Sequence, residues 1–216
     1  MLRVVNFFTV TEYAPHRALI RKSSVSGMRA REDRRVLHSI CRNIREEHLE
    51  LLDAPLRFGI SADAICEPQT AKLQTSQEIR ELATRIRLYF SRGLVVAPLA
   101  LGNHVDHLAV NRAAVASVVN RRLGFYEDLP YATWTSESAL QERLRALQDE
   151  THIDLSARIM RSNCAGIANK LRALRCYQSQ ITREEARNMT AFARRYGGGE
   201  RIWAPKRSRA WTVLTQ

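Results

Sequence analysis

Two histidines and an aspartate lie within the short segment Gly102-Asn103-His104-Val105-Asp106-His107. Imidazole and carboxylate groups are zinc ligands, and a catalytic zinc needs three protein ligands and leaves one position for water. Zinc-bound water loses its proton near neutral pH and becomes a nucleophile. An unligated imidazole can donate a proton or stabilise an oxyanion, and a neighbouring carboxylate can orient a ring. The segment therefore predicts part of a metal-dependent hydrolytic site.

A buried strand and a helix must hold these side chains in place. The apolar run Leu94–Ala97 precedes the segment, and a helical pattern continues from about 107 to 123. Open α/β sheets bind ligands beyond the carboxyl ends of their strands, which is where the segment falls. The three-residue spacing of His104 and His107 brings both rings toward one side of a helix. The alternative is that His104 belongs to the loop, His107 to the first helical turn, and neither binds a ligand.

The remaining histidines are separate from this segment. His16 follows the first expected strand and should lie on the same sheet edge, so it is an alternative metal ligand. For His38, His48 and His152 we expect surface or structural roles.

Strands and helices alternate along most of the chain. Strands are expected near 4–10, 48–52, 94–97, 151–155 and 200–203, and a strand running into a turn is expected over 125–131. Helices are expected near 28–45, 76–90, 107–123, 163–177 and 183–196. This alternation predicts an α/β fold with a mostly parallel sheet flanked by helices. We expect residues 1–216 to form one domain, with an antiparallel extension in its last third.

The chain is strongly basic, with a formal net charge of +12 and a pI near 10.3. Four of the 34 basic residues are lysine; the arginines are dispersed and mostly stand beside acids, as in Arg31-Glu32-Asp33-Arg34-Arg35. Dispersed charge without a groove-reading motif argues against a dedicated nucleic-acid partner.

The sequence contains neither a long apolar run nor a secretory signal, so we expect a cytoplasmic protein without a membrane span. Its four cysteines form no Cys-x-x-Cys pair, which argues against a zinc ribbon or a redox motif.

Five segments carry a resemblance to a known family. They are Gly102–Val110, Arg29–Asp33, Leu52–Arg57, Phe125–Tyr131 and Lys170–Gln180. In these motifs, and in their order along the chain, the sequence resembles the zinc-dependent de-N-acetylases of the PIG-L/LmbE-like family. The second metal motif of that family is His-x-x-His.

The resemblance implies a Rossmann-like α/β fold and removal of an acetyl group from an N-acetylglucosamine-type sugar or a related amide. It implies that His107 is a ligand of Zn²⁺ and that His104 is the general acid or the oxyanion-stabilising imidazole. Asp106 would orient its neighbour, and Arg29 would contact the acetylated amino sugar.

The family's first metal motif, His-Pro-Asp-Asp-Glu, does not occur in this sequence. The strand over Val4–Val10 resembles the family's second strand, so we expect the first strand–helix unit, two zinc ligands and the general base to be missing. Such a chain would have an unpaired strand edge and an apolar groove beside Val4–Val10. It would be an incomplete or inactive deacetylase; the alternative is a non-catalytic relative that binds a sugar or a protein partner.

Overall fold

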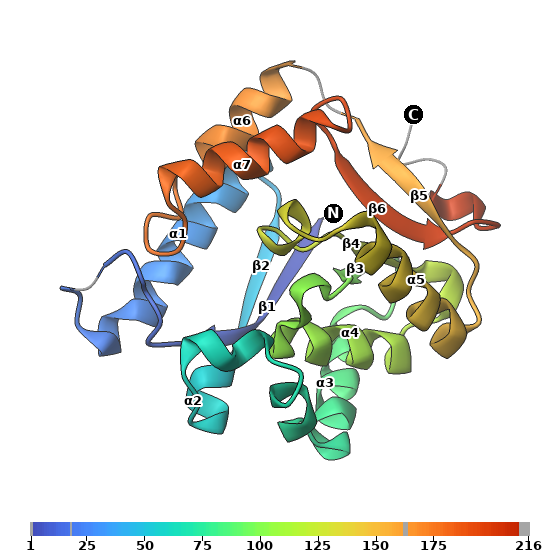
Figure 1. Ribbon diagram of the computed structural model, residues 1–216, viewed down its shortest axis with the longest axis horizontal. Coiled ribbons are helices and arrows are strands. Elements are labelled where there is room, and N and C mark those ends of the chain that lie inside the picture. Colours follow the sequence, from blue (N-terminus) through green and yellow to red (C-terminus); the bar gives the residue numbers. More distant parts are fainter. Residues whose placement is uncertain (1, 18, 162–163, 212–216) are drawn as a thin grey trace.

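The computed structural model describes residues 2–17, 19–161 and 164–211 and has a mixed α/β fold (Figure 1). Its first sheet pairs β1 (Arg3–Val10) with β2 (Arg45–Leu52) in parallel, connected by α1 (Val25–Ile40). β-Branched and aromatic residues dominate β1 and favour the strand conformation. The strand predicted over Val4–Val10 is confirmed.

The second sheet has four strands. They are, in spatial order, β3 (Val95–Pro98), β4 (Leu123–Tyr126), β6 (Glu200–Pro205) and β5 (Leu155–Met160). β3 and β4 are parallel and are connected through α4 (Val105–Ser117), whereas β6 is antiparallel to both β4 and β5. The predicted antiparallel extension is confirmed. The described strands form two sheets, however, where the sequence predicts one mostly parallel sheet.

The remaining helices cover these sheets. They are α2 (Ala54–Phe58), α3 (Ser76–Tyr89), α5 (Glu137–Thr151), α6 (Cys164–Leu174) and α7 (Arg183–Arg194). α1, α6 and α7 gather on one side of the strands, and α3 and α4 pack together on the other (Figure 1). Capping boxes at Thr75 and Thr182 fix the starts of α3 and α7.

Short 3-10 helices complete the connections. They occupy Lys22–Ser24, Ala62–Cys66, Thr70–Leu73, Leu101–Asn103, Asn120–Arg122 and Tyr131–Thr133. The predicted helix to about residue 123 is wrong at its end, because the chain becomes extended at Val118. The strand predicted from Phe125 ends at Tyr126, where the chain leaves the sheet. The strand predicted over 151–155 is wrong in its bounds: α5 continues to Thr151 and β5 begins at Leu155.

The apolar core lies between the strands and the helices α3, α4 and α5. Its fully buried side chains include Ile86, Leu99, Leu123, Phe125 and Leu147. A smaller cluster around Trp211 closes the outer side of β4: a Cβ atom on Gly124 would lie 2.6 Å from the Trp211 ring. Glycine at this position lets the indole pack directly on the strand backbone.

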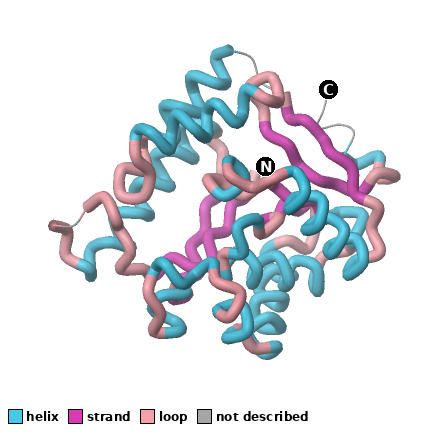
Figure 2. The backbone as a smooth tube through the Cα atoms, viewed as in Figure 1, coloured by secondary structure: helices cyan, strands magenta, loops and turns pink. Residues whose placement is uncertain are grey.

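β1 and β3 each have one open edge. Among the described residues, β1 pairs with β2 alone and β3 pairs with β4 alone. Figure 2 shows the strands as separate groups. Residues 2–9, in and directly before β1, and residues 94–98, around β3, line a common cavity of about 840 Å³. The predicted unpaired edge beside Val4–Val10 is thus present among the described residues, and the cavity next to it is lined by polar and charged as well as apolar side chains.

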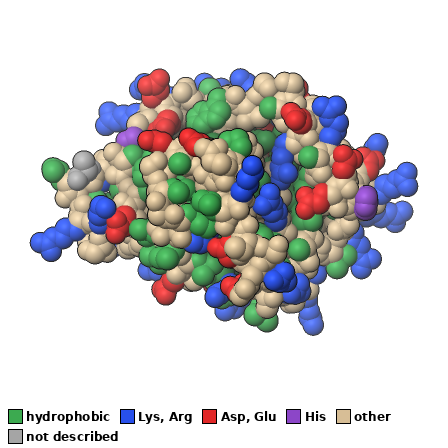
Figure 3. Space-filling view, turned by 60° about the horizontal axis from the view of Figure 1, so that its bottom comes forward, with side chains coloured by type: hydrophobic (Ala, Val, Ile, Leu, Met, Phe, Trp, Pro, Cys, Tyr) green, Lys and Arg blue, Asp and Glu red, His purple; other side chains and the backbone are tan. Residues whose placement is uncertain are grey.

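Charged side chains are mixed on the face shown in Figure 3. Lys and Arg side chains project around its rim with acidic side chains between them, and hydrophobic side chains gather nearer its middle. Within the described ranges, no helix has the length and apolar character needed to cross a bilayer.

Candidate active site

The loop between β3 and α4 positions the predicted histidines at the carboxyl end of the second sheet. It contains left-handed backbone at Ala100, Gly102 and Asn103, with φ of 62°, 72° and 58°. At Gly102 a Cβ atom would lie 2.4 Å from Cδ1 of Tyr131. A residue with a Cβ atom would be strained at this φ and would clash with Tyr131. Glycine at position 102 therefore lets Tyr131 pack against the start of α4.

His104 is the N-cap of α4. Its Nδ1 atom accepts a hydrogen bond of 3.1 Å from the backbone N–H of Asp106. In the neutral ring the proton then resides on Nε2, which is left free to donate. Burial lowers the pKa of His104 to about 3, and the nearby His107, Arg29 and Arg57 act in the same direction. This environment favours a neutral hydrogen-bond donor over a general acid.

His107 stacks on His104, with ring centroids 4.6 Å apart, and contacts a buried carboxylate. Its Nδ1 atom lies 2.8 Å from Oδ1 of Asp128, whose side chain is fully buried. The other oxygen, Oδ2, accepts a 3.1 Å hydrogen bond from the backbone N–H of Leu101. The two atoms are close but are not aligned as a hydrogen bond. A rotation of the imidazole would turn this contact into the carboxylate–histidine pair that is common in metal-binding histidines, with Nε2 left for a ligand.

Asp128 was not among the residues predicted to act in the site. It follows β4, the parallel neighbour of β3, so its carboxylate lies at the same sheet edge as His107. The rule that carboxyl ends of adjacent parallel strands share one edge would have identified it.

The carboxylate of Asp106 is directed toward α2. It accepts a 3.1 Å hydrogen bond from the backbone N–H of Ala54 and pairs with Arg57 at 2.9 Å. Burial raises the pKa of Asp106, and Arg57 opposes this effect. Among the described residues it is the backbone N–H of Asp106, and not its carboxylate, that contacts the His104 ring. The contact between Asp106, the predicted orienting residue, and the ring of His104 is therefore made through the backbone.

Arg29 reaches the same cavity from α1, and the cavity brings it together with His104, Asp106 and His107. Its guanidinium donates to Oγ1 of Thr11 at 3.4 Å and to Oε1 of Gln180. Burial lowers the pKa of Arg29, and nearby carboxylates led by Asp33 raise it. The structure thus joins all four predicted site residues in one cavity.

The alternative ligand His16 lies elsewhere. It lines a separate cavity of about 580 Å³, and its Nε2 atom is 3.8 Å from Glu185. The prediction that it shares a site with His104 finds no support in this placement.

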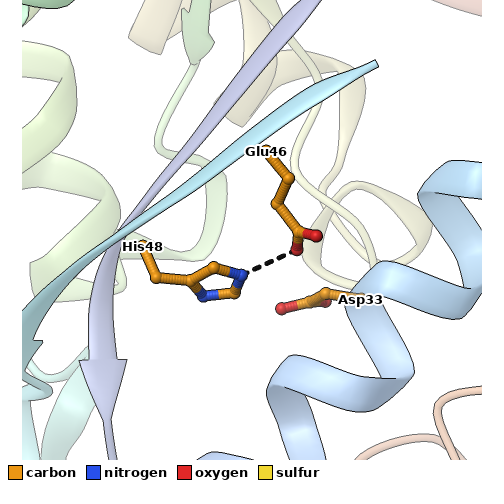
Figure 4. A group of neighbouring side chains, drawn as sticks. All are labelled: Asp33, Glu46 and His48. Atoms are coloured by element: carbon orange, nitrogen blue, oxygen red, sulfur yellow. Dashed lines mark hydrogen bonds and ion pairs between the residues drawn. The ribbon is translucent and has the colours of Figure 1, made fainter. Parts of the chain in front are cut away.

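His48 lies in a cluster with two carboxylates, and the sequence did not lead us to predict this cluster. Asp33, Glu46 and His48 offer ligand atoms that all lie within 4.8 Å of one another (Figure 4). His48 and Glu46 are two apart on β2, so both face α1, where Asp33 resides. The residue pattern Glu-x-His on a strand was the available signal.

The atoms of this triad already have protein partners. Nε2 of His48 lies 2.7 Å from Glu46, and Asn6 donates to Asp33 at 3.4 Å. Burial raises the pKa of Asp33, while a hydrogen bond from Tyr177 lowers it. The triad is a possible metal-ligand set, and it also forms a hydrogen-bonded network that joins α1 to β2.

The residues around His107 do not by themselves make a complete zinc site. In the part of the chain that the structure describes, the triad is the one group that brings three ligand atoms together. His107 offers a single oriented imidazole, whereas a catalytic zinc requires three protein ligands.

Comparisons with known proteins give deacetylases. No family model matches the sequence. A curated protein from Streptomyces fradiae, 2'-N-acetylparomamine deacetylase, is 33% identical over 139 residues, which are 55% of this chain and 46% of that protein. The chain thus spans about half the length of this relative.

Two solved structures share the fold. The A40926 pseudoaglycone deacetylase Dbv21 superposes with a TM-score of 0.66 at 20% identity, over 96% of this chain and 86% of the other. A deacetylase of teicoplanin biosynthesis, solved with teicoplanin, gives 0.66 at 22% identity, over 94% and 85%. The chain therefore has the fold seen in these deacetylases and is similar in sequence to 2'-N-acetylparomamine deacetylase.

Proposed function

We propose that this chain forms most of the catalytic cleft of a zinc-dependent de-N-acetylase of the PIG-L/LmbE-like type. Its substrate would be an N-acetylated amino sugar or a related amide. The observation that carries the proposal is the 2.8 Å contact between His107 and the buried Asp128 beside the stacked His104. The sequence similarity to 2'-N-acetylparomamine deacetylase supports the substrate class.

Each cleft residue has a role in this proposal. His107, oriented by Asp128, is one zinc ligand. Zinc, when bound, lowers the pKa of a water molecule and so provides a hydroxide nucleophile. His104 holds a proton on Nε2 and donates it as a hydrogen bond to the oxyanion that forms from the acetyl carbonyl. Arg29 contacts the sugar, and Asp106 fixes His104 through its backbone N–H.

The remaining ligands and the general base must come from other residues. We assign them to a strand outside residues 1–216 that lies between β1 and β3. The open edges of β1 and β3 and the cavity of about 840 Å³ between them support this assignment. The carboxyl end of a strand placed there in parallel would lie beside the histidines. The segments that follow β2 and β3 meet at that side, where the N–H of Ala54 donates to Asp106.

Zinc content and acetate release test the proposal. Residues 1–216 would be compared with a chain extended by the upstream in-frame codons. The extended chain should bind about one zinc and release acetate from 2'-N-acetylparomamine, and a chelator should abolish the release. An extended chain that binds zinc without releasing acetate, or binds none, would contradict the proposal.

A non-catalytic, sugar-binding relative is the second candidate function. It is favoured by the incomplete ligand set around His107 among the described residues. Saccharide binding without acetate release by the extended chain would identify it.

A further inference from the structure

Trp134 is an exposed aromatic residue beside the candidate active site. Of the three tryptophans, Trp203 and Trp211 are buried, whereas Trp134 is 62% exposed. Trp134 lines the same cavity as His104 and His107. Because a large exposed aromatic side chain next to a polar cleft is a frequent binding element, its surroundings bear on function.

The indole of Trp134 has a fixed position relative to the histidines. It packs edge-on against Tyr131 at 5.7 Å, and Tyr131 in turn packs edge-on against His104 at 5.9 Å and His107 at 5.7 Å. Tyr131 is itself fixed by its close approach to Gly102. The indole is therefore the outermost member of an aromatic row that begins at the stacked imidazoles.

Hydrogen bonds also fix the backbone under Trp134. Its N–H donates to the carbonyl oxygen of Tyr131 at 3.2 Å, and the hydroxyl of Thr135 donates to the same oxygen at 2.9 Å. The N–H of Ala132 donates to the carbonyl oxygen of Asp128 at 2.8 Å. The residue that orients His107 thus also anchors the turn that presents the indole.

We propose that Trp134 is a stacking platform for a pyranose ring of the acetylated amino sugar. This inference rests on the proposed function and names the subsite through which the sugar binds. The axial C–H groups of a pyranose give it an apolar face, which an indole can cover. Arg29 and Gln180 line the same cavity and offer polar partners for hydroxyl groups. An aromatic platform combined with such polar groups suits a sugar better than a purely apolar ligand.

Fluorescence quenching tests the platform without relying on hydrolysis. Acrylamide should quench Trp134 selectively in residues 1–216, because the other two indoles are buried. The probe is N,N'-diacetylchitobiose, with cellobiose as the saccharide that lacks acetamido groups. Diacetylchitobiose should protect Trp134 from acrylamide at saturation. Trp134 that stays fully quenchable at saturating saccharide overturns the inference.

Matched variants complete the test, with binding measured by saturation-transfer NMR of the acetyl methyl groups. Trp134→Ala should weaken binding at least about tenfold, and Trp134→Phe should stay within about threefold of the parent. Leu88→Ala removes another exposed apolar side chain, which is on α3 and outside the cavity lining, and should leave binding unchanged. Unchanged affinity in Trp134→Ala overturns the inference.

Two further outcomes separate this inference from the proposed function. Protection of Trp134 by the saccharide in an extended chain that never releases acetate supports the subsite and contradicts the deacetylase. Acetate release with an unchanged KM in Trp134→Ala contradicts the subsite alone.

A contact between copies of the chain could also shield the indole. In that case Trp134 would become less quenchable as the protein concentration rises, without saccharide, and sedimentation would show dimers. This result would overturn the inference.

Discussion

Nδ1 of His107 lies 2.8 Å from Oδ1 of the buried Asp128, and Oδ2 of the same carboxylate accepts the Leu101 N–H. One carboxylate therefore lies against the ring of His107 and holds, by a hydrogen bond, the loop that leads into α4. The contact to His107 bears on ligand binding, and the contact to Leu101 bears on folding. A substitution of Asp128 that keeps only one of the two contacts can therefore distinguish these effects.

Asp128→Asn should weaken zinc binding by the extended chain about 10- to 100-fold, because the amide cannot replace the anionic partner of His107. An amide oxygen can still accept from Leu101, so the free energy of unfolding of residues 1–216 should change by less than about 1 kcal/mol. Competition with a chelator and urea denaturation measure the two effects. Equal zinc affinity in the variant would remove Asp128 from its assigned role.

Gly102→Ala should destabilise the fold by about 2 kcal/mol or more, since the new Cβ atom combines an unfavourable φ with a clash against Tyr131. Gly93→Ala is the matched control: its φ is +79°, but no atom lies within 4 Å of the new Cβ. The control should cost only about 1 kcal/mol. Urea denaturation measures the free energy of unfolding of both variants. Equal losses of this free energy would mean that Tyr131 moves aside readily for the new Cβ atom.

His48→Ala should lower the free energy of unfolding by about 1–3 kcal/mol, because Glu46 is largely buried and loses its close partner. Zinc binding by the extended chain should be unaffected, because the proposal places the zinc at His107 and not at this triad. His38→Ala, at an exposed position of α1, is the control for removing an imidazole. If His48→Ala loses the bound zinc and His107→Ala keeps it, the metal site is the triad and not His107.

Arg57→Ala should destabilise the chain by about 3 kcal/mol, because it leaves the buried Asp106 carboxylate without its charged partner. The arginine also lies over the rings of Phe8 and Phe58, each at 4.4 Å. Arg57→Lys keeps the charge and should recover part of the loss. Thermal or urea unfolding is the measurement; a neutral Arg57→Ala would show that water solvates Asp106 adequately.

Local patterns predicted much of the fold. The apolar runs at Val4–Val10 and Leu94–Ala97 identified β1 and β3, because strands with little exposure need nearly continuous apolar sequence. α5 was missed although Leu140, Leu144 and Leu147 mark one buried face of it. The end of α4 was misplaced because Val118 and Val119 continue the apolar spacing after the backbone has become extended.

The site was predicted only where its residues are neighbours in sequence. His104, Asp106 and His107 share one helix start, and their types and spacing predicted a metal-dependent site there. The contact of His107 with Asp128 and the triad of Asp33 with Glu46 and His48 join different elements. Such pairings depend on strand order and helix packing, which periodicity does not encode.

The open edges of β1 and β3 also affect the behaviour of the isolated chain in solution. Unpaired backbone N–H and C=O groups beside exposed apolar side chains accept a strand from any source, including another molecule of the same chain. Residues 1–216 are therefore expected to self-associate as their concentration rises. An engineered peptide that pairs with β1 would serve as an intermolecular cap and keep the chain monomeric.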